Sequence, residues 1–388
     1  MLTRLADADQ ESCGGKATML GGLLRAGLPV PDGFVIPKAD PAAGNMKITR
    51  SLRAAVTAEL VRLGDPVVAV RSSATSEDST EASAAGQYES VIGVRGTESV
   101  CDAIVTCRSS ARAPRVNHYW SRAQPADAPP APGMAVLVQR MIAADASGVM
   151  FTPQQAGDPT RIEASWGLGL SVVGGTVTPD TYEVQPDGSI TCTVGSKDTR
   201  IDPDAGRGGV TTRTVAADQR HVRALDDRMV TTLTGLGSRI AELLGGPQDI
   251  EWAVTGDAVW VLQARPITAR LPATRLTTSP LPPQALQGTP GAHGTVTGCA
   301  RIVRGPSDFQ AVQPGDIVIC PYTDPAWTPL FRIAAGVVTE TGGTLSHAAI
   351  VAREYGIPAV LGVPDALTLI ENGSQVTLDG TAGTITPT

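Results

Sequence analysis

The 388-residue sequence has no long apolar run, few aromatic residues and no paired-cysteine motif. No stretch approaches the roughly 18 consecutive apolar residues that a membrane-spanning helix requires, and the N-terminus lacks the apolar segment of a secretion signal. The six cysteines are scattered without a CxxC pair, which argues against a disulfide framework and a cysteine-based zinc site. We therefore expect a cytoplasmic protein without a membrane partner.

Charge of either sign is also limited. Charged residues make up 18% of the sequence, and the net charge of −7 is spread without a long run of one sign. This pattern argues against nucleic acid as the main partner and favours small-molecule chemistry. The 42% hydrophobic content is typical of a folded protein. Because the chain is too long for one ordinary core, we expect two or three domains.

The domain organisation follows from one proline-rich stretch. Residues 269–287 contain four prolines, no acidic residue and little periodicity, which is typical of a linker. Before it, helical patterns near 17–26, 51–63 and 224–244 alternate with strand patterns that end in a mostly antiparallel region. After it, short strands surround one helix. The predicted fold class is α/β and α+β, with domains at 1–268 and 288–388.

One histidine lies between a glycine turn and an apolar helix, in the stretch TGGTLSHAAIVAREYG. Ser346 can cap this helix and Gly356 can end it, so His347 is predicted in the first turn. The helix N-terminus favours a bound anion and disfavours imidazolium, which leaves a neutral, nucleophilic ring. His347 is therefore a candidate phosphate carrier. From this stretch alone, a capping or packing histidine is an equally good interpretation.

Two basic residues have the setting of phosphate ligands. Lys16 follows two glycines before a helix, which can bind phosphate, although an exposed loop lysine is the more frequent case. Arg71 ends a buried strand and enters a hydroxyl-rich loop. Its guanidinium can hold phosphate oxygens at two points, or it can be an ordinary surface arginine in a solvated turn.

A predicted hairpin adds oxygen ligands. Two strands joined by a tight turn place Asp249, Glu251, Gln263 and Arg265 on like-facing positions. The Glu251 carboxylate and the Gln263 carboxamide suit Mg²⁺, and Arg265 can take a terminal phosphate. The alternative is a cross-strand salt bridge on a solvated face. The apolar strand around Gln139 can pair its backbone with an adenine edge, although such strands are usually core.

In this order, the segments resemble the phosphoenolpyruvate synthase and pyruvate phosphate dikinase family. The matching stretches are GGKATMLGGLLRAGLPVPDGFVI, VAVRSSATSEDS, VLVQRMI with SGVMFT, IEASWGLGLSVVGGTVTPD, QDIEWAV with VWVLQARPIT, and YTDPAWTPLF through TETGGTLSHAAIVAREYGIPAVLGV. They cover nearly the whole chain. The histidine segment is most similar to that of rifampin phosphotransferases.

The resemblance implies a two-part ATP-grasp domain that binds Mg-ATP and a swivelling domain whose His347 takes the β-phosphoryl group. It implies Mg²⁺ ligands at Glu251 and Gln263, and hydroxyl contacts from Thr344 and Ser346 to the phosphohistidine. The residues implied to bind ATP are Lys16, Arg71, Arg115, Gln139, Met141, Ile142, Asp249, Glu251, Gln263 and Arg265. The other histidines, His118, His221 and His293, match no catalytic position of the family, and we interpret them as structural or surface residues.

We expect no domain in this sequence that binds the phosphoryl acceptor. Members of the resembled family add a barrel that binds pyruvate, or an antibiotic-binding domain, and neither is expected between residues 268 and 288 or after the histidine helix. We therefore expect a dikinase-type phosphotransferase that releases AMP and passes phosphate to an unidentified acceptor, on a separate protein or at the domain cleft. Two alternatives stay open: a self-contained kinase for a metabolite or antibiotic, and a non-catalytic phosphocarrier or regulatory protein.

Overall fold

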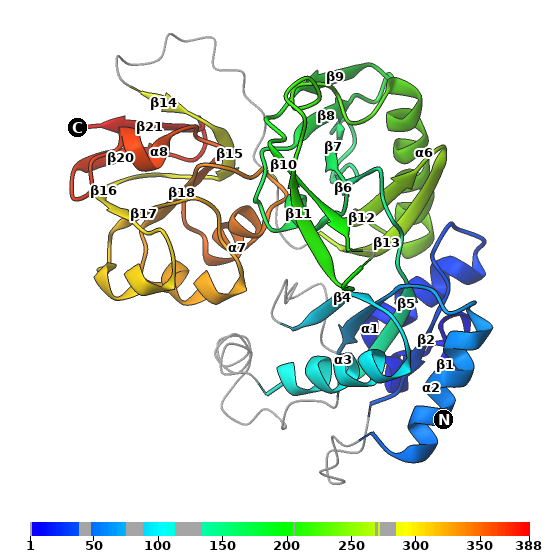
Figure 1. The fold of residues 1–388 in the computed structure, drawn as a ribbon. Coiled ribbons are helices and arrows are strands. Elements are labelled where there is room, and N and C mark those ends of the chain that lie inside the picture. Colours follow the sequence, from blue (N-terminus) through cyan, green and yellow to red (C-terminus); the bar gives the residue numbers. More distant parts are fainter. Residues whose placement is uncertain are drawn as a thin grey trace.

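The structure is a computed structural model that describes residues 2–38, 48–74, 88–112, 134–204, 206–267, 271 and 285–388. These residues form three larger sheets and one two-stranded ribbon, with helices packed on them (Figure 1). Arg115, His118 and most of the predicted linker 269–287 lie outside the described residues. None of the helices in the described part of the chain is both long and apolar enough to cross a bilayer.

The first sheet is antiparallel and lies near the N-terminus. Its strands are β1 (Thr3–Arg4), β2 (Gly33–Ile36), β3 (Val68–Ser73), β4 (Ser90–Val94) and β5 (Ala135–Arg140), in the order β1-β2-β5-β3-β4. A short 3₁₀ helix at Leu5–Asp7 precedes α1 (Gln10–Arg25), and α2 (Arg50–Arg62) and α3 (Thr97–Ser110) complete this part. Alternating strand residues contact α1 on one side and α2 with α3 on the other.

Helix α1 begins earlier than the sequence patterns predicted. We expected a start near Ala17, but the helical segment begins at Gln10, where Asp9 caps it by accepting a hydrogen bond from the Ser12 backbone N–H. The segment passes through Gly14, whose φ of 77° breaks the regular helix. Gly14 therefore separates a first helical turn from the helix that follows, so the predicted glycine turn is present and the sequence patterns missed only the turn that Asp9 caps.

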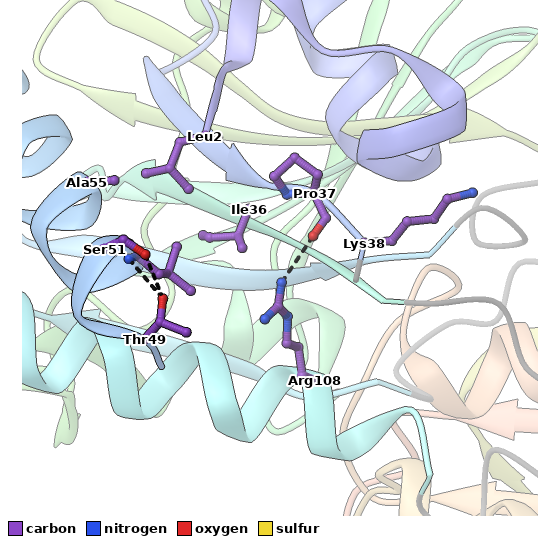
Figure 2. Close-up of a pocket in the computed structure, with 9 residues that line it drawn as sticks. Leu2, Ile36, Pro37, Lys38, Thr49, Ser51, Ala55 and Arg108 are labelled. Atoms are coloured by element: carbon purple, nitrogen blue, oxygen red, sulfur yellow. Dashed lines mark hydrogen bonds between the residues drawn. The ribbon is translucent and has the colours of Figure 1, made fainter. Parts of the chain in front are cut away.

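A cavity of about 370 Å³ lies between the first sheet and its helices. Its lining includes Leu2 and Ile36 on the apolar side, and Lys38, Thr49 and Arg108 on the polar side. Figure 2 shows Arg108 reaching from α3 to the carbonyl of Pro37, to which its Nη2 donates at 3.0 Å. Among the residues that the structure describes, none of those predicted to bind ATP or phosphate lines this cavity.

The second sheet is also antiparallel and, with six strands, has more strands than the first. Its strands are β6 (Ala146–Phe151), β7 (Thr160–Trp166), β8 (Asp180–Val184), β9 (Ile190–Thr193), β12 (Gln248–Thr255) and β13 (Ala258–Pro266), in the order β13-β12-β6-β7-β8-β9. This confirms the predicted antiparallel region. Helix α6 (Asp227–Leu244) packs on one face, through contacts among Met150, Ile162, Ile250 and Leu233.

Short elements complete this part. Helix α5 (Leu170–Val173) follows β7, and the ribbon pairs β10 (Thr199–Pro203) with β11 (Val210–Thr214). The Gly209 N–H, in the turn between β10 and β11, donates to the Gly93 carbonyl in the first sheet at 2.8 Å. A Cβ on Gly93 would lie 2.2 Å from the Gly209 oxygen, so glycine is required for this approach. The ribbon thereby connects the two sheets that flank the predicted ATP site.

The third sheet contains the C-terminal strands. They are β14 (Leu286–Gln287), β15 (Thr289–Ala292), β16 (Thr295–Ile302), β17 (Ile317–Cys320), β18 (Gly336–Thr339), β19 (Ala359–Leu361), β20 (Gln375–Asp379) and β21 (Thr384–Pro387), in the order β14-β21-β20-β16-β17-β18-β19-β15. The run from β16 to β19 is parallel, and the outer pairs are antiparallel. The helices are 3₁₀ turns at Pro306–Ala311 and Pro325–Arg332, with α7 (His347–Tyr355) and α8 (Ala366–Leu369).

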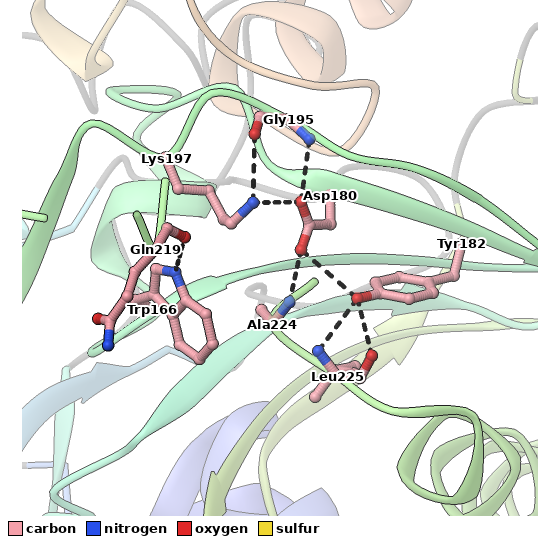
Figure 3. Close-up of polar contacts among 8 residues, drawn as sticks. All are labelled: Trp166, Asp180, Tyr182, Gly195, Lys197, Gln219, Ala224 and Leu225. Carbon is pink, nitrogen blue, oxygen red and sulfur yellow. Dashed lines mark hydrogen bonds and ion pairs between the residues drawn. The ribbon is translucent and has the colours of Figure 1, made fainter. Parts of the chain in front are cut away.

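A fully buried ion pair fixes the start of β8 (Figure 3). The side chains of Asp180 and Lys197 are both 0% exposed, and Lys197 Nζ donates to the Asp180 carboxylate. The same carboxylate accepts from the Gly195 N–H at 2.9 Å and from the Ala224 N–H at 2.7 Å. The Tyr182 hydroxyl adds a fourth donor at 3.4 Å. Asp180 therefore joins β8 to two loops that follow it in the chain.

We predict that Lys197→Met destabilises the protein strongly, because it leaves Asp180 as a buried charge without its cation. The expected loss is about 3–5 kcal/mol in the free energy of unfolding, measured by urea denaturation followed by tryptophan fluorescence. Arg228→Met is the control, because the Arg228–Asp257 pair is solvent-exposed, and it should leave the unfolding midpoint unchanged. Equal midpoints for both variants would contradict this role of the buried pair.

Candidate functional site

Lys16 lies at the end of β3 because α1 approaches that strand closely. A Cβ on Gly14 would lie 2.2 Å from the Ser73 carbonyl oxygen, so only glycine allows this contact. The Lys16 side chain is buried, and its Nζ donates to the Ser72 carbonyl at 3.1 Å. The alternative of an exposed loop lysine is thereby excluded. The ammonium instead lies beside the strand that carries Arg71.

Arg71 connects the first sheet to the hairpin of the second sheet. Its Nη2 donates to Gln263 Oε1 at 2.6 Å and lies 3.4 Å from Glu251 Oε2. Its Nη1 donates to the Leu262 carbonyl at 2.6 Å. The register of β12 and β13 shifts just after the Glu251–Gln263 pair, which leaves Leu262 as an extra residue in the bulge. The bulge therefore supplies the carbonyl that fixes the guanidinium.

The hairpin of β12 and β13 has the register that the sequence predicted. Asp249 pairs with Arg265 and Glu251 pairs with Gln263, so all four side chains face the same side of the sheet. Arg265 Nε donates to Asp249 Oδ2 at 2.7 Å within a buried pair. Burial raises the pKa of Asp249, and Arg265 opposes that shift. The predicted cross-strand arrangement is confirmed, and Asp249 is engaged by the arginine.

The fit of this site to Mg²⁺ depends on two oxygen donors. No group of three or more His, Cys, Asp or Glu side chains that could hold a metal occurs among the described residues. The Glu251 side chain remains 25% exposed and faces the Gln263 carboxamide across the hairpin. A carboxylate and a carboxamide are hard oxygen ligands of the kind that Mg²⁺ accepts together with phosphate oxygens. The residues present therefore fit a magnesium ion that arrives with a nucleotide.

The predicted adenine segment lies between the first and second sheets. Gln139 is buried, and its Nε2 donates to the Pro31 carbonyl at 3.0 Å. The Met141 N–H donates to the Val67 carbonyl at 2.9 Å. Met141 and Ile142 pack in an apolar cluster with Leu262, the residue whose carbonyl holds Arg71. This segment therefore provides an apolar wall beside the polar residues of the hairpin.

His347 is the first residue of α7, as the sequence predicted. Gly356 ends the helix with a φ of 67°, and Ser346 is the N-cap residue. The Ser346 hydroxyl makes no capping bond and donates instead to the Gly343 carbonyl at 2.8 Å. The predicted side-chain capping bond is therefore not formed, because the hydroxyl is directed toward the turn before the helix and its oxygen accepts from no helix N–H.

The imidazole of His347 is almost completely buried. Its Nδ1 lies 2.9 Å from Thr323 Oγ1, and its Nε2 has no hydrogen-bond partner among the residues that the structure describes. The Phe331 ring lies edge-on at 6.4 Å between ring centres. Burial lowers the pKa of His347 to about 4. Because of this burial the ring is neutral at physiological pH, as predicted.

The histidine loop, residues 341–346, lies against the second sheet. Figure 1 shows α7 on the side of the C-terminal sheet that is nearest to the green part of the chain. The Thr344 N–H and hydroxyl donate to Glu163 Oε1 at 2.6 and 2.7 Å, and the Leu345 N–H donates to Glu163 Oε2 at 3.1 Å. Leu345 packs on Val149 and Phe151 of β6. The structure thus brings the loop that carries His347 onto the ATP-binding part.

Strand register places this contact on the same face as the hairpin residues. Glu163 pairs with Val149, Val149 pairs with Glu251, and Glu251 pairs with Gln263. Residues directly opposite each other across a sheet point to the same side. Because neighbouring strands lie about 4.8 Å apart, Glu163 and Glu251 are separated by about 10 Å along the sheet. The histidine loop and the predicted metal ligands share one surface.

Three residues of this site were not singled out from the sequence: Thr323, Glu163 and Arg353. Thr323 contacts His347, and Arg353 Nη1 donates to the Thr344 carbonyl at 2.8 Å. Both Thr323 and Glu163 lie in segments that carried the family resemblance. No spacing in the sequence connects them to His347, because the contacts join strands and loops far apart in the chain. Only Arg353 is close, on the helix that His347 begins.

Comparison with known proteins gives the family. Residues 42–279 match the pyruvate phosphate dikinase AMP/ATP-binding domain, and residues 312–383 match the mobile domain of PEP-utilising enzymes. The chain belongs to the pyruvate phosphate dikinase family. The ATP-grasp and mobile-domain architecture predicted from the sequence is thereby confirmed, as a mixed α/β and α+β fold.

Several curated relatives of this dikinase-family chain are named phosphoenolpyruvate synthase. A probable phosphoenolpyruvate synthase of Methanothermobacter thermautotrophicus is 34% identical over 428 residues, which cover 98% of this chain and 62% of the relative. Phosphoenolpyruvate synthases of Pyrococcus furiosus and Deinococcus radiodurans are 35% and 36% identical over 82% of this chain, which corresponds to 40% and 43% of their own lengths. The chain therefore spans about half the length of these relatives.

The depressed pKa of His347 predicts a pH-dependent stability. Between pH 6.5 and 4 the unfolded chain binds a proton on this ring that the folded chain does not, so stability falls as pH decreases through this window. Between pH 6.5 and 5 this ring should cost the parent protein about 2 kcal/mol in the free energy of unfolding, and we expect His347→Gln not to show that loss. The measurement is urea denaturation at several pH values.

The control for this titration is His221→Gln, because His221 is exposed. It should retain the acid sensitivity of the parent protein. If the His347→Gln variant lost stability on acidification as steeply as the parent, the imidazole would not be buried in its neutral form.

Proposed function

We propose that this chain performs ATP-dependent phosphoryl transfer through His347, in the manner of a phosphoenolpyruvate synthase or pyruvate phosphate dikinase. In this proposal residues 1–268 bind Mg-ATP, residues 288–388 form the swivelling domain, and residues 269–287 connect them. The observation that carries the proposal is the shared surface. The loop before His347 contacts Glu163, which lies about 10 Å along the sheet from Glu251. A bound triphosphate can span such a separation.

The ATP-binding side supplies charges suited to a triphosphate. Lys16, Arg71 and Arg265 provide cations from α1, β3 and β13, and Glu251 with Gln263 would hold Mg²⁺. When bound, the metal ion neutralises part of the phosphate charge that develops during transfer. Arg71 engages Gln263 and lies beside Glu251 in this structure. We propose that it moves to the phosphate oxygens when the nucleotide binds.

His347 is the proposed nucleophile, with Nε2 as the reacting atom. A proton on Nδ1, donated to Thr323 Oγ1, would leave the Nε2 lone pair free, and Nε2 has no partner among the described residues. Nε2 attacks the β-phosphorus of ATP and forms a nitrogen–phosphorus bond. The bond between the β-phosphorus and the oxygen that it shares with the α-phosphorus breaks, and AMP leaves with that oxygen. Water or phosphate then removes the γ-phosphoryl group from the histidine. The remaining phosphoryl group passes to the acceptor.

The acceptor is proposed from the names of the relatives. Because those proteins are called phosphoenolpyruvate synthases, we propose a small carboxylic acid of the pyruvate class as the first acceptor to test. The chain covers only part of their length, so an acceptor site on a separate protein is included in the proposal. To transfer the phosphoryl group to such an acceptor, His347 has to leave the surface of the second sheet.

We predict that ATP labelled at the β-phosphorus transfers its label to the protein and releases AMP. His347→Ala should abolish labelling, because it removes the nucleophile. Labelling is measured on the denatured protein under alkaline conditions, which preserve phosphohistidine, and the nucleotides are separated by chromatography. Label that persists in His347→Ala would contradict the proposed carrier, and release of ADP in place of AMP would contradict attack at the β-phosphorus.

We predict that Glu251→Ala and Gln263→Ala each slow this labelling by about a hundredfold or more, because each removes a metal ligand from the transfer step. Raised magnesium concentrations should recover part of the rate. Glu242→Ala is the control, since Glu242 is exposed on α6, which packs on the opposite face of the sheet. Labelling at the control rate in both hairpin variants would exclude these two side chains as ligands.

A further inference from the structure

Glu163 has a buried side-chain carboxylate that accepts hydrogen bonds from the C-terminal domain. The residue is 0% exposed on β7, and burial raises the pKa of its carboxyl group. Its two oxygens accept from the Thr344 N–H, the Thr344 hydroxyl and the Leu345 N–H, at 2.6, 2.7 and 3.1 Å. A carboxylate without such donors would be costly to bury. While the histidine loop covers Glu163, the three loop donors therefore take the place of water around its carboxylate.

The loop is shaped to fit this carboxylate. An ideal Cβ on Gly343 would lie 2.4 Å from Glu163 Oε1, so a side chain at this position would collide with the acid. Gly343 itself has no left-handed φ, which means that the close approach, and not the backbone conformation, requires glycine. On the other side of the loop, Arg353 Nη1 donates to the Thr344 carbonyl at 2.8 Å. The loop is held from both domains.

Two further contacts set the position of the loop on the sheet. Thr341 Oγ1 donates to the Gly175 carbonyl at 2.6 Å, and the Gly342 N–H donates to the Val177 carbonyl at 3.0 Å. These carbonyls lie on the segment between α5 and β8, which leads directly into the buried Asp180. The docking surface is therefore continuous with the segment that the buried Asp180–Lys197 pair holds.

The charged groups around Glu163 connect it to the ATP site. Arg353 interacts favourably with both Glu163 and Asp249, and its pKa falls to about 10 because of burial. Asp249 is bonded to Arg265 on the same face. Leu345 fills the space over Val149 and Phe151, on the strand between β7 and β12. The docked loop thus lies on the sheet between Glu163 and the hairpin that carries Glu251.

We infer that Glu163 is a positioning residue that docks the histidine loop on the ATP-binding domain, so that His347 receives its phosphoryl group only while this carboxylate holds the loop. The catalytic part of this inference rests on the proposed function. The hydrogen bonds of the Glu163 carboxylate go to Thr344 and Leu345, so Glu163 acts on His347 through these two residues. Undocking exchanges these three donors for water, which allows the loop to leave without an unpaired buried acid.

The first test uses Glu163→Gln in the full-length protein, because glutamine keeps the shape of the side chain. Its amide group presents N–H donors to the loop, where two acceptor oxygens are needed. We expect the 341–346 segment to exchange its amide hydrogens at least tenfold faster, measured by mass spectrometry. The rate of His347 labelling at saturating ATP should fall at least tenfold, with half-saturation by ATP changed less than twofold. Glu242→Ala serves again as the control.

The second test uses the close approach at Gly343. Gly343→Ala should undock the loop by collision with Glu163, with the same increase in exchange. In Glu163→Ala the colliding atoms are gone, so adding Gly343→Ala to that background should change neither exchange nor labelling further. Independent effects that multiply in the double variant would overturn the inference, because they would mean that the two positions do not meet.

The two readouts separate this inference from the proposed function. If the parent protein takes no label from ATP, the proposed function fails, while the exchange measurement still tests docking. If the parent is labelled and Glu163→Gln matches it in both exchange and labelling rate, the docking role is wrong. Faster exchange with an unchanged labelling rate would also overturn the inference, because phosphorylation would then not depend on the docked loop.

Discussion

The contact between one buried carboxylate and the backbone of a neighbouring domain organises the functional part of this molecule. Glu163 accepts three hydrogen bonds from the histidine loop, and Leu345 adds apolar contact on the adjacent strand. Because Glu163 is in register with Glu251 and Gln263, the loop is placed on the face that carries the candidate ATP site. The position of His347 relative to that site follows from this register.

The first and second sheets are held around the site by separate polar contacts. Arg71 extends from β3 to the bulge at Leu262, and the Gly209 N–H bonds to the Gly93 carbonyl at the end of the ribbon. Lys16 is fixed by a glycine that permits α1 to approach β3. In each case a backbone carbonyl fixes the position of a donor. Of these donors, Arg71 and Lys16 carry the positive charges that we propose bind a triphosphate.

Much of the local architecture was predictable because it depends on short-range patterns. The period of two in the hairpin fixed the like-facing positions of Asp249, Glu251, Gln263 and Arg265. Likewise, Gly356 predicted the end of α7, and His347 was placed correctly at its start. The glycine turn before the helix that follows Gly14 was predicted, whereas the helical turn that Asp9 caps ahead of it was not.

The remaining features depend on contacts that no local pattern encodes. Thr323 reaches His347 from the segment before a 3₁₀ turn, and Glu163 reaches Thr344 from another sheet. The low pKa of His347 likewise results from burial by residues that lie far apart in the chain. The central claim is that neutral His347 accepts phosphate on Nε2 while it is docked. Phosphorus NMR of ¹⁵N-histidine-labelled protein after reaction with ATP tests it most directly. The account predicts one phosphorus signal coupled to Nε2 of His347, whereas coupling to Nδ1, or the absence of any phosphorus–nitrogen coupling, would contradict it.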